Sequence, residues 1–411
     1  MNRIVLVCHF STEELRNHLP LKNLNIEKKL RHILGATSLS YSDLAPWIPA
    51  FIKSFEKHSE YEFHVVSHHY GLKKELVTFS QGNIHYHIIR QERGVFFRVL
   101  DRFFHYDEKN DYLHNRKIIS RIIDPVKPQL MVICGIENPF YSAVALNDNN
   151  PPLLLILQTL LNSSKRIEMG VGDEYRRELE KRIIKKATRV ACCDNESSGF
   201  VRKNAPQAKI FDFTFPTNDP EISNVQKDKT FVFFARGIEK FKGVEDVLKA
   251  FSILQKKHPE STLEIIGDCR PEYKIFLDEM IGELKIKDSV SYYPFFPSHQ
   301  DALIQVQKAY VAVLPGITAP LNGTVREAML LGMPTIVYRN SVIDKINGDN
   351  NKIFAAEMED INDLANKMTY VMENIIEAKK VAANGKKYAE THFTSSSAGE
   401  RLVSIIRESI C

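Results

Sequence analysis

The stretch Phe231–Gly243, FVFFARGIEKFKG, passes from an apolar strand into a polar loop and then into the start of a helix. The strand ends at Ala235, and Gly237 and Gly243 give the loop backbone freedom to turn. In an open α/β sheet, ligands bind at the carboxyl ends of strands, where cations beside a helix N-terminus suit a diphosphate. A solvated basic loop is the alternative interpretation. The cations of this loop are Arg236, Lys240 and Lys242.

On both sides of this stretch, short apolar runs alternate with amphipathic segments, which predicts parallel sheets covered by helices. The predicted strands are Arg3–Val7, Glu62–Val66, Ile84–Ile89, Gln129–Cys134, Leu153–Gln158, Arg189–Cys193, Phe231–Phe234, Leu263–Ile266, Val290–Tyr293, Tyr310–Leu314 and Thr335–Val337. The predicted helices are Leu44–Glu56, Ile118–Asp124, Glu174–Lys186, Glu245–Lys257, Glu272–Leu284, Gln300–Gln307, Thr324–Leu330, Ile361–Ile376 and Ser397–Ser409. The fold class is therefore α/β, with two Rossmann-like domains.

A turn-rich break at Phe215–Asp228 separates the two domains. We expect residues 1–218 to form an N-terminal domain. Residues 219–411 are expected to form the C-terminal domain.

The second informative stretch is Leu314–Val337, LPGITAPLNGTVREAMLLGMPTIV. A strand ends at its first residues, and a helix begins near Asn322 and Gly323, where free backbone amides suit phosphate oxygens. Glu327 lies one turn further on, where a carboxylate could bind a ribose diol. The alternative is that Glu327 faces water on an amphipathic helix.

Together the two stretches resemble the nucleotide-binding half of the group 1 (family 4) retaining glycosyltransferases, which have the GT-B architecture. That family has a strand followed by Arg, a short loop and Lys-Gly. Further on it has a Glu-x7-Glu motif that ends in Glu-Ala-Met, and then Gly-x-Pro and another strand. The resemblance covers Phe231 to about Arg339, and the first half of the chain matches only in its strand–helix rhythm. The corresponding residues are Arg236, Lys242-Gly243, Glu327-Ala328-Met329 and Gly332-Met333-Pro334.

This resemblance implies two domains that face each other across a cleft, with the last helix crossing back to the first domain. It implies that the domain of residues 1–218 binds the acceptor and that the domain of residues 219–411 binds a nucleotide-sugar. It implies that Arg236 and Lys242 neutralise the diphosphate leaving group, and that Glu327 binds the ribose hydroxyls. Main-chain amides of a helix start would hold the diphosphate, and a further loop would flank the base. The residues at these positions are Asn322, Gly323, Thr324, Val325, Phe296 and Pro297.

Two positions depart from the family pattern. The first Glu of Glu-x7-Glu falls on Ala319, so donor choice or the rate of chemistry could differ, or catalysis could be lost. The spacing between Arg236 and Lys242 is one residue longer than usual, so that the loop could bulge or Lys240 could share the role.

In the first domain, Glu137 follows a predicted strand on the ligand side of the sheet and is the acceptor or catalytic candidate. Asp43 also precedes a predicted helix, where capping is the expected role. His68, His69 and His105 are assigned to packing or to the surface.

The composition is that of a globular protein, with 44% apolar and 26% charged residues. The net charge of +4, from 55 basic and 51 acidic residues, argues against a nucleic-acid partner.

No apolar run approaches the length needed to span a bilayer, and no secretory signal is evident, so a cytoplasmic location is expected. The basic stretch Arg176–Arg189 leaves peripheral contact with the inner face of a membrane open, although a core-packed helix is preferred. We expect buried free thiols at most of the cysteines, Cys8, Cys134, Cys192, Cys193, Cys269 and Cys411.

These observations predict an enzyme that moves a hexose-type sugar from a UDP- or GDP-sugar to a glycan or lipid-linked acceptor, with retention and without a metal ion. Polysaccharide assembly is a setting suggested by the resemblance alone. No cofactor is expected beyond the donor itself. A GT-B nucleotide-sugar epimerase and a binding relative that has lost catalysis remain alternatives. An NAD-dependent dehydrogenase is disfavoured because no G-x-G-x-x-G follows the first strand.

Overall fold

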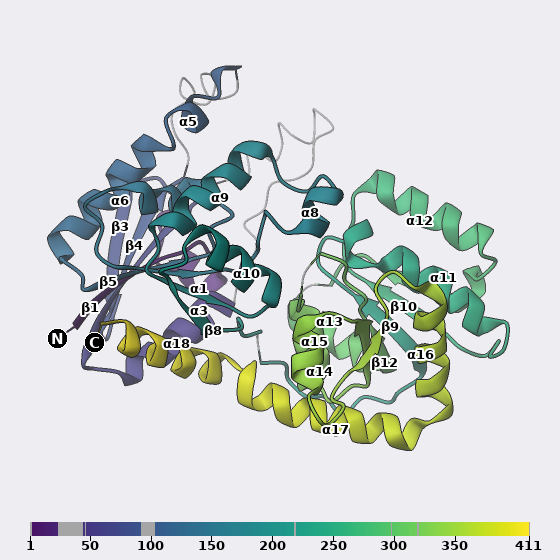
Figure 1. Cartoon of the computed structure of the whole chain (residues 1–411). Coiled ribbons are helices and arrows are strands. Elements are labelled where there is room, and N and C mark those ends of the chain that lie inside the picture. The colour runs from purple at the N-terminus through teal and green to yellow at the C-terminus, as the bar shows by residue number, and fades with distance from the viewer. Residues whose placement is uncertain are drawn as a thin grey trace. The chain divides into compact units, whose positions relative to one another are not determined.

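The computed structural model describes residues 2–23, 44–45, 47–91, 103–217, 219–296, 298–318 and 320–410. The chain forms two compact units (Figure 1). Unit 1 comprises Met1–Phe215 together with Ala398–Cys411, and unit 2 comprises Pro216–Ser397. Each unit is built on a mainly parallel sheet with helices against it, so the predicted α/β fold with two Rossmann-like domains is confirmed.

Among its described residues, unit 1 has an eight-stranded sheet in the order β3-β4-β2-β1-β5-β6-β7-β8. Its neighbouring strands are parallel except for the antiparallel pair β3 and β4. The strand order reverses between β1 and β5, and such a reversal is where doubly wound sheets bind ligands. The strands are β1 (Asn2–Val7), β2 (Tyr61–His69), β3 (Leu76–Gln81), β4 (Ile84–Arg90), β5 (Leu130–Cys134), β6 (Leu153–Ile156), β7 (Arg189–Cys192) and β8 (Lys209–Asp212).

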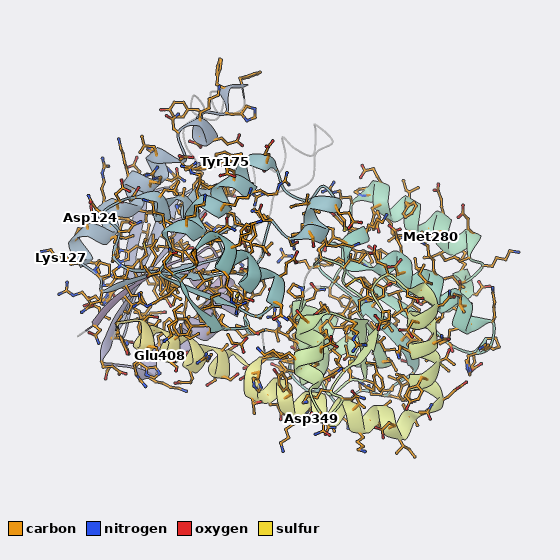
Figure 2. The ribbon with its side chains drawn as sticks, viewed as in Figure 1. Asp124, Lys127, Tyr175, Met280, Asp349 and Glu408 are labelled. Carbon is orange, nitrogen blue, oxygen red and sulfur yellow. The ribbon has the colours of Figure 1, made fainter. Side chains whose placement is uncertain are left out.

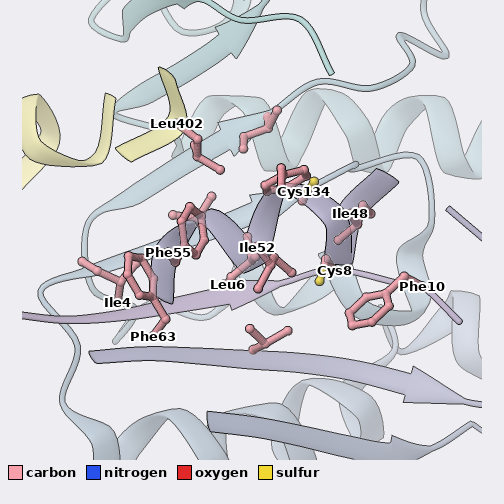
Figure 3. Packing of buried hydrophobic residues seen from close by; sticks show 14 of the residues in the cluster. Ile4, Leu6, Cys8, Phe10, Ile48, Ile52, Phe55, Phe63, Cys134 and Leu402 are labelled. Atoms are coloured by element: carbon pink, nitrogen blue, oxygen red, sulfur yellow. The ribbon is translucent and has the colours of Figure 1, made fainter. Parts of the chain in front are cut away.

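The central strands of unit 1 are apolar on both faces because helices cover both faces of the sheet. Ile4 faces one hydrophobic cluster and Val5 the other, as strand alternation requires. Figure 3 shows part of the first cluster, to which Phe55 and Leu402 belong together with Ile4 of β1. The helices of the unit are α1 (Glu13–Asn17), α3 (Trp47–Ile52), η1 (Lys53–Lys57), α5 (Tyr106–Lys109), α6 (Leu113–Val126), α7 (Pro139–Ser142), η2 (Ala143–Leu146), α8 (Ser164–Glu168), α9 (Glu174–Lys186) and α10 (Asn195–Asn204).

In the described part of unit 2, six parallel strands form a sheet in the order β11-β10-β9-β12-β13-β14. The strands are β9 (Lys229–Phe234), β10 (Leu263–Ile266), β11 (Val290–Tyr293), β12 (Ala309–Val313), β13 (Thr335–Tyr338) and β14 (Phe354–Ala356). The helices are η3 (Lys240–Lys242), α11 (Val244–Gln255), α12 (Pro271–Glu283), η4 (Lys287–Ser289), α13 (His299–Val306), α14 (Gly323–Leu330), α15 (Ser341–Asn347), α16 (Ile361–Glu373) and α17 (Ile375–His392).

The last helix, α18 (Ser395–Ile410), returns the chain from unit 2 to unit 1. Its apolar stripe is buried, and Leu402, Val403, Ile405 and Ile406 belong to the same cluster as Ile4. The sequence analysis anticipated this helix because its apolar positions recur at helical spacing.

Several elements differ from the sequence-based prediction. The helix predicted over Leu44–Glu56 is divided into α3 and the 3₁₀ segment η1. The elements that were not predicted include the strands β3, β8 and β14 and the helices α10, α15 and α17. No residue of β3 is buried: its positions alternate between exposed and partly exposed. The strand therefore lacks the apolar pattern that predicts a buried strand.

The cysteine prediction agrees with the structure for three of the cysteines. Cys8, Cys134 and Cys192 are buried free thiols, and burial raises the pKa of the Cys192 thiol to about 12. Cys193 and Cys269 are free but partly exposed, and Cys411 lies outside the described residues. Across the described ranges, none of the helices combines the length and apolar character needed to cross a bilayer.

Candidate active site

The loops that follow β9 and β12 lie side by side at the carboxyl edge of the unit 2 sheet. β9 pairs with β10 on one side and with β12 on the other, so the strand order reverses between β9 and β12. Ligands of doubly wound sheets bind outside the strand ends at this kind of reversal. The topology therefore brings together residues 235–243 and 314–323, the two stretches that carry the sequence motifs.

Close backbone packing joins these two loops. The Ile317 amide donates to the carbonyl oxygen of Phe241 at 3.0 Å. Gly243 has a φ of 84°, and a Cβ there would overlap the carbonyl oxygen of Pro315. A side chain at this position would therefore be both strained and obstructed.

The cations of the first loop stand at the start of α11. Arg236 has an exposed side chain, and Lys240 is exposed as well. Lys242 is half-buried, with Nζ 5.4 Å from the centroid of the Phe241 ring. Gly243 is the N-cap of α11 and supplies no capping side chain, so the first amides of this helix lack a side-chain cap. Cations and open amides together suit a diphosphate.

The second loop leads into α14, whose N-terminus is also without a side-chain cap. Asn322 is the N-cap residue, but its side chain makes no capping hydrogen bond. The backbone amides of Gly323, Thr324 and Val325 occupy the first turn, where helix geometry leaves such groups without intrahelical partners. All four residues thus lie at a helix start beside the cationic loop, as the sequence analysis expected.

Glu327 is buried, with an exposed fraction of 6%, so the alternative that it faces water is wrong. Its Oε1 atom accepts a hydrogen bond from Thr217 Oγ1 at 2.9 Å and lies 2.9 Å from His299 Nε2. No described residue donates a hydrogen bond to Oε2. Two partners therefore fix the carboxylate through one oxygen and leave the other for a ligand.

His299 forms an ion pair with Glu327 when its imidazole is protonated. The hydrogen bond and charge of Glu327 raise the pKa of His299, while burial and the positive charge of Arg236 act in the opposite direction.

Sequence reasoning missed both partners of Glu327. Thr217 lies in the segment that was assigned to a linker, and its amide donates to the carbonyl oxygen of Phe393 at 3.0 Å. His299 is the first residue of α13, one position before the predicted start of that helix. The capping box of Ser298 with Asp301 was a signal for that start.

The residues proposed to flank the base are only partly described. Phe296 is half-buried, and its ring centroid lies 6.0 Å from that of Tyr293. Pro297 and Ala319 lie outside the described residues, as does Asp43 in unit 1.

In unit 1, Glu137 follows β5 at the point where the strand order reverses between β1 and β5. Its Oε2 atom is buried and has no hydrogen-bond partner among the described residues. Burial, with a smaller contribution from the charge of Glu180, raises the pKa of Glu137 to about 7, against the opposing charges of Arg176 and Arg166. A carboxyl group with this pKa can hold or release a proton near neutral pH.

The backbone around Glu137 is held in place by neighbouring groups. Arg176 Nε donates to the Glu137 carbonyl oxygen at 3.0 Å, and its Nη2 atom donates to the same oxygen. The Tyr141 hydroxyl donates to the carbonyl oxygen of Cys134 at 3.0 Å. Glu180 is fully buried and accepts hydrogen bonds from the amides of Leu161 and its neighbour.

Two further histidines lie near the same strand ends: the sequence analysis did not consider His9, and it assigned His68 to packing or to the surface. His9 follows β1, and its ring centroid lies 6.4 Å from that of Tyr141. Burial lowers the pKa of His9 to about 4 and that of His68, on β2, to about 3. Both imidazoles are therefore neutral at pH 7, and His68 Nδ1 is buried without a partner among the described residues. His105, by contrast, is exposed beside α5.

The basic helix α9 packs its apolar stripe into the core of unit 1. Leu179, Ile183 and Ile184 are almost completely buried. Arg182 forms two hydrogen bonds with Asp111, and Tyr175, labelled in Figure 2, lies close to the same carboxylate. The apolar stripe is therefore part of the core, as the preferred interpretation stated.

Known proteins resemble both the sequence of unit 2 and the fold of the chain. Residues 216–388 match the family model of group 1 glycosyl transferases, so the match coincides with most of unit 2. An uncharacterized glycosyltransferase of Haemophilus influenzae is 22% identical over 286 residues, which cover 66% of this chain and 74% of that protein.

Solved structures share the fold over nearly the whole chain. Sucrose-phosphate synthase from Thermosynechococcus elongatus superposes with a TM-score of 0.71 at 15% identity, covering 99% of both chains. Anabaena HepE in complex with UDP and glucose gives a TM-score of 0.63 at 11% identity, covering 99% of this chain and 100% of that one. An E. coli chain bound with UDP-2-fluoro glucose gives 0.70 at 10% identity, with 99% of both chains covered. The fold of the chain is therefore that of GT-B glycosyltransferases.

Proposed function

Because the chain has a GT-B fold and residues 216–388 match the group 1 glycosyl transferases, we propose that it transfers a hexose from a nucleoside-diphosphate donor to an acceptor hydroxyl. The acceptor is a glycan or a lipid-linked sugar. Transfer proceeds with retention of anomeric configuration and without a metal ion, as the family resemblance implies.

The observation that carries this proposal is the arrangement of Glu327. Thr217 and His299 hold one oxygen of its carboxylate, and the other oxygen is available to accept a hydrogen bond from a ribose hydroxyl. The helix that carries this buried carboxylate starts beside the cationic loop. The free carboxylate oxygen suits the ribose of a nucleoside diphosphate, and the cationic loop suits its phosphates.

The chemistry places negative charge on the leaving diphosphate as the bond to the anomeric carbon breaks. Arg236 and Lys242, together with the open amides of α11 and α14, would stabilise that charge. Loss of one such donor typically lowers kcat about 10²–10³-fold. The leaving phosphate can accept the proton of the acceptor hydroxyl, so a dedicated base is not required.

We assign the acceptor to the carboxyl edge of the unit 1 sheet. Glu137 supports this assignment because it lies at the strand-order reversal with a buried, unpartnered oxygen and a pKa near neutrality. Protonated or ionised, it can donate or accept a hydrogen bond with a sugar hydroxyl. The neutral imidazoles of His9 and His68 add further groups for a polar, uncharged acceptor.

The donor base is proposed to be uracil. The Anabaena structure holds UDP and glucose, and the E. coli structure holds UDP-2-fluoro glucose, which supports a UDP-hexose over a GDP-hexose. The location is proposed to be cytoplasmic, with any membrane contact peripheral.

The test is turnover of UDP-glucose and GDP-mannose by wild type and by Arg236→Ala, with and without a mixed glycan acceptor set. We expect UDP release that depends on acceptor in wild type and falls at least about 100-fold in the variant. Lys285→Ala on the η4 side of the unit serves as the cation control. Epimerised donor without acceptor would favour the epimerase alternative. UDP binding without any turnover would favour a relative that has lost catalysis, which Ala319 motivates.

A further inference from the structure

Three potential metal ligands gather on the sheet of unit 1, away from the residues discussed above. Among the described residues, Glu62, His64 and His85 each place one ligand atom so that all three atoms lie within 4.8 Å of one another. Glu62 Oε1 lies 3.1 Å from His64 Nε2 and 3.5 Å from His85 Nε2. In a tetrahedral zinc site with bonds of ~2.0–2.1 Å, ligand atoms lie roughly 3.3 Å apart.

The parallel pairing of β2 with β4 creates this cluster. His64 pairs in register with His85, so their side chains stand next to each other on the same face. Glu62 lies two residues before His64 and therefore shares that face. The positions of the three side chains are thus fixed by two adjacent strands of a sheet and not by a loop.

Groups behind the three ligands orient them. Ser80 Oγ on β3 lies 2.7 Å from His85 Nδ1, and His87 Nε2 lies 3.0 Å from His64 Nδ1. Arg3 Nε lies 3.7 Å from the second oxygen, Oε2, of Glu62. Each ligand is therefore held through an atom other than the one that faces the cluster. Such outer partners set the tautomer and direction of metal-binding histidines.

We propose that Glu62, His64 and His85 bind a Zn²⁺ ion, with water in the fourth position. Two imidazole nitrogens and one carboxylate oxygen form a ligand set that zinc accepts and that Mg²⁺ and Ca²⁺ disfavour. The side chains of Glu62, His64 and His85 are 28%, 10% and 29% exposed, which leaves access for the ion and its water.

Zinc at this position stabilises unit 1 and takes no part in sugar transfer. The cluster lies at the beginnings of β2 and β4, whereas the proposed acceptor residues lie at the carboxyl ends of the strands. His68 lies four positions after His64 on β2, which is roughly 13 Å along a strand. The ion links the strand β4 to the more central strand β2. The edge strand β3 is connected to the site through Ser80, which contacts His85.

The test is metal binding by the full-length protein after chelator treatment. Zn²⁺ affinity is measured by competition with a chromophoric chelator, and site geometry by the visible absorption of bound Co²⁺. We expect one Zn²⁺ per chain at micromolar affinity or tighter, a tetrahedral Co²⁺ spectrum, and a higher Tm with Zn²⁺ but not with Mg²⁺.

Three variants and one control examine the assignment. Glu62→Gln and His85→Gln should each abolish both the Co²⁺ spectrum and the rise in Tm. Ser80→Ala should weaken Zn²⁺ binding by about 10–100-fold. The exposed His105→Gln should bind as wild type does. Equal Zn²⁺ binding by wild type, Glu62→Gln and His85→Gln would overturn the proposal, and so would an absence of binding at micromolar Zn²⁺. UDP binding is expected to be unchanged by the chelator, so this outcome is independent of the transferase proposal.

Discussion

Replacement of Glu327 by alanine should weaken the binding of UDP and leave the binding of pyrophosphate nearly unchanged. In the proposed complex, Oε2 of Glu327 accepts a hydrogen bond from a ribose hydroxyl, while the diphosphate contacts other groups. A hydrogen bond to a charged group contributes about 1.5–3 kcal/mol, and ~1.4 kcal/mol corresponds to tenfold in Kd. The Kd for UDP should therefore rise roughly 10–100-fold.

The variant is expected to remain folded. Removal of the carboxylate leaves the buried hydroxyl of Thr217 without its acceptor, which costs about 1–3 kcal/mol. A domain with ~5–15 kcal/mol of stability tolerates that loss. Isothermal titration calorimetry with UDP and with pyrophosphate gives both affinities, and urea unfolding verifies the fold.

Arg236→Ala is the matched comparison, because the loss of a phosphate-binding cation should weaken both ligands. If Glu327→Ala weakened the binding of UDP and of pyrophosphate equally, Glu327 would act on the shape of the site and not on the ribose. Unchanged binding of UDP by the same variant would refute its assigned role.

Three further perturbations follow from the structure. In Gly243→Ala the new residue must adopt a φ of 84°, and its Cβ overlaps the carbonyl oxygen of Pro315. The free energy of unfolding of unit 2, measured in urea, should therefore fall by about 1–3 kcal/mol. The control Gly282→Ala places its Cβ in open space and should not be destabilised. The pKa of His299 is raised by Glu327, so its contribution to stability is present below the unfolded pKa of ~6.5 and is lost as the pH rises through the folded value. The free energy of unfolding of wild type should therefore exceed that of His299→Gln at acidic pH, and this excess should disappear at alkaline pH. A difference in unfolding free energy that stays constant with pH would argue against the ion pair. Burial raises the pKa of Glu137 from 4.5 to about 7, so ionising this carboxyl group is less favourable in the folded protein than in the unfolded chain. As the pH rises from 5 to 8, the free energy of unfolding of wild type should fall relative to that of Glu137→Gln, by roughly 3 kcal/mol at most. A flat difference in urea unfolding free energy would mean that Glu137 is solvated.

Much of the fold was accessible from the sequence because its central strands are buried on both faces. The fully buried strand Leu263–Ile266 was predicted with the bounds that the structure gives, and Glu174–Lys186 was predicted as one helix. Strands of this kind appear as short runs of apolar residues between polar turns. Exposed or very short elements carry no such run, and so β3 and β14 were missed.

The donor motifs were also readable, because each lies within one strand–loop–helix segment. The order of Arg236, Lys242 and Gly243 after β9, and of Asn322 and Glu327 after β12, is a property of local sequence. Local order identifies the residue types that a diphosphate and a ribose require. It does not report whether a side chain is buried.

Tertiary structure alone decided which distant residues meet. Thr217 and His299 reach the same oxygen of Glu327 from separate segments, 110 and 28 residues away. His64 meets His85 through the register of two parallel strands, and burial at a strand-order reversal raises the pKa of Glu137. The sequence by itself determined the class of fold and the chemistry available at each loop, because periodicity and turn residues act locally. Pairing, burial and electrostatic coupling depend on distances between segments that are remote in the chain, and only the folded structure sets those distances.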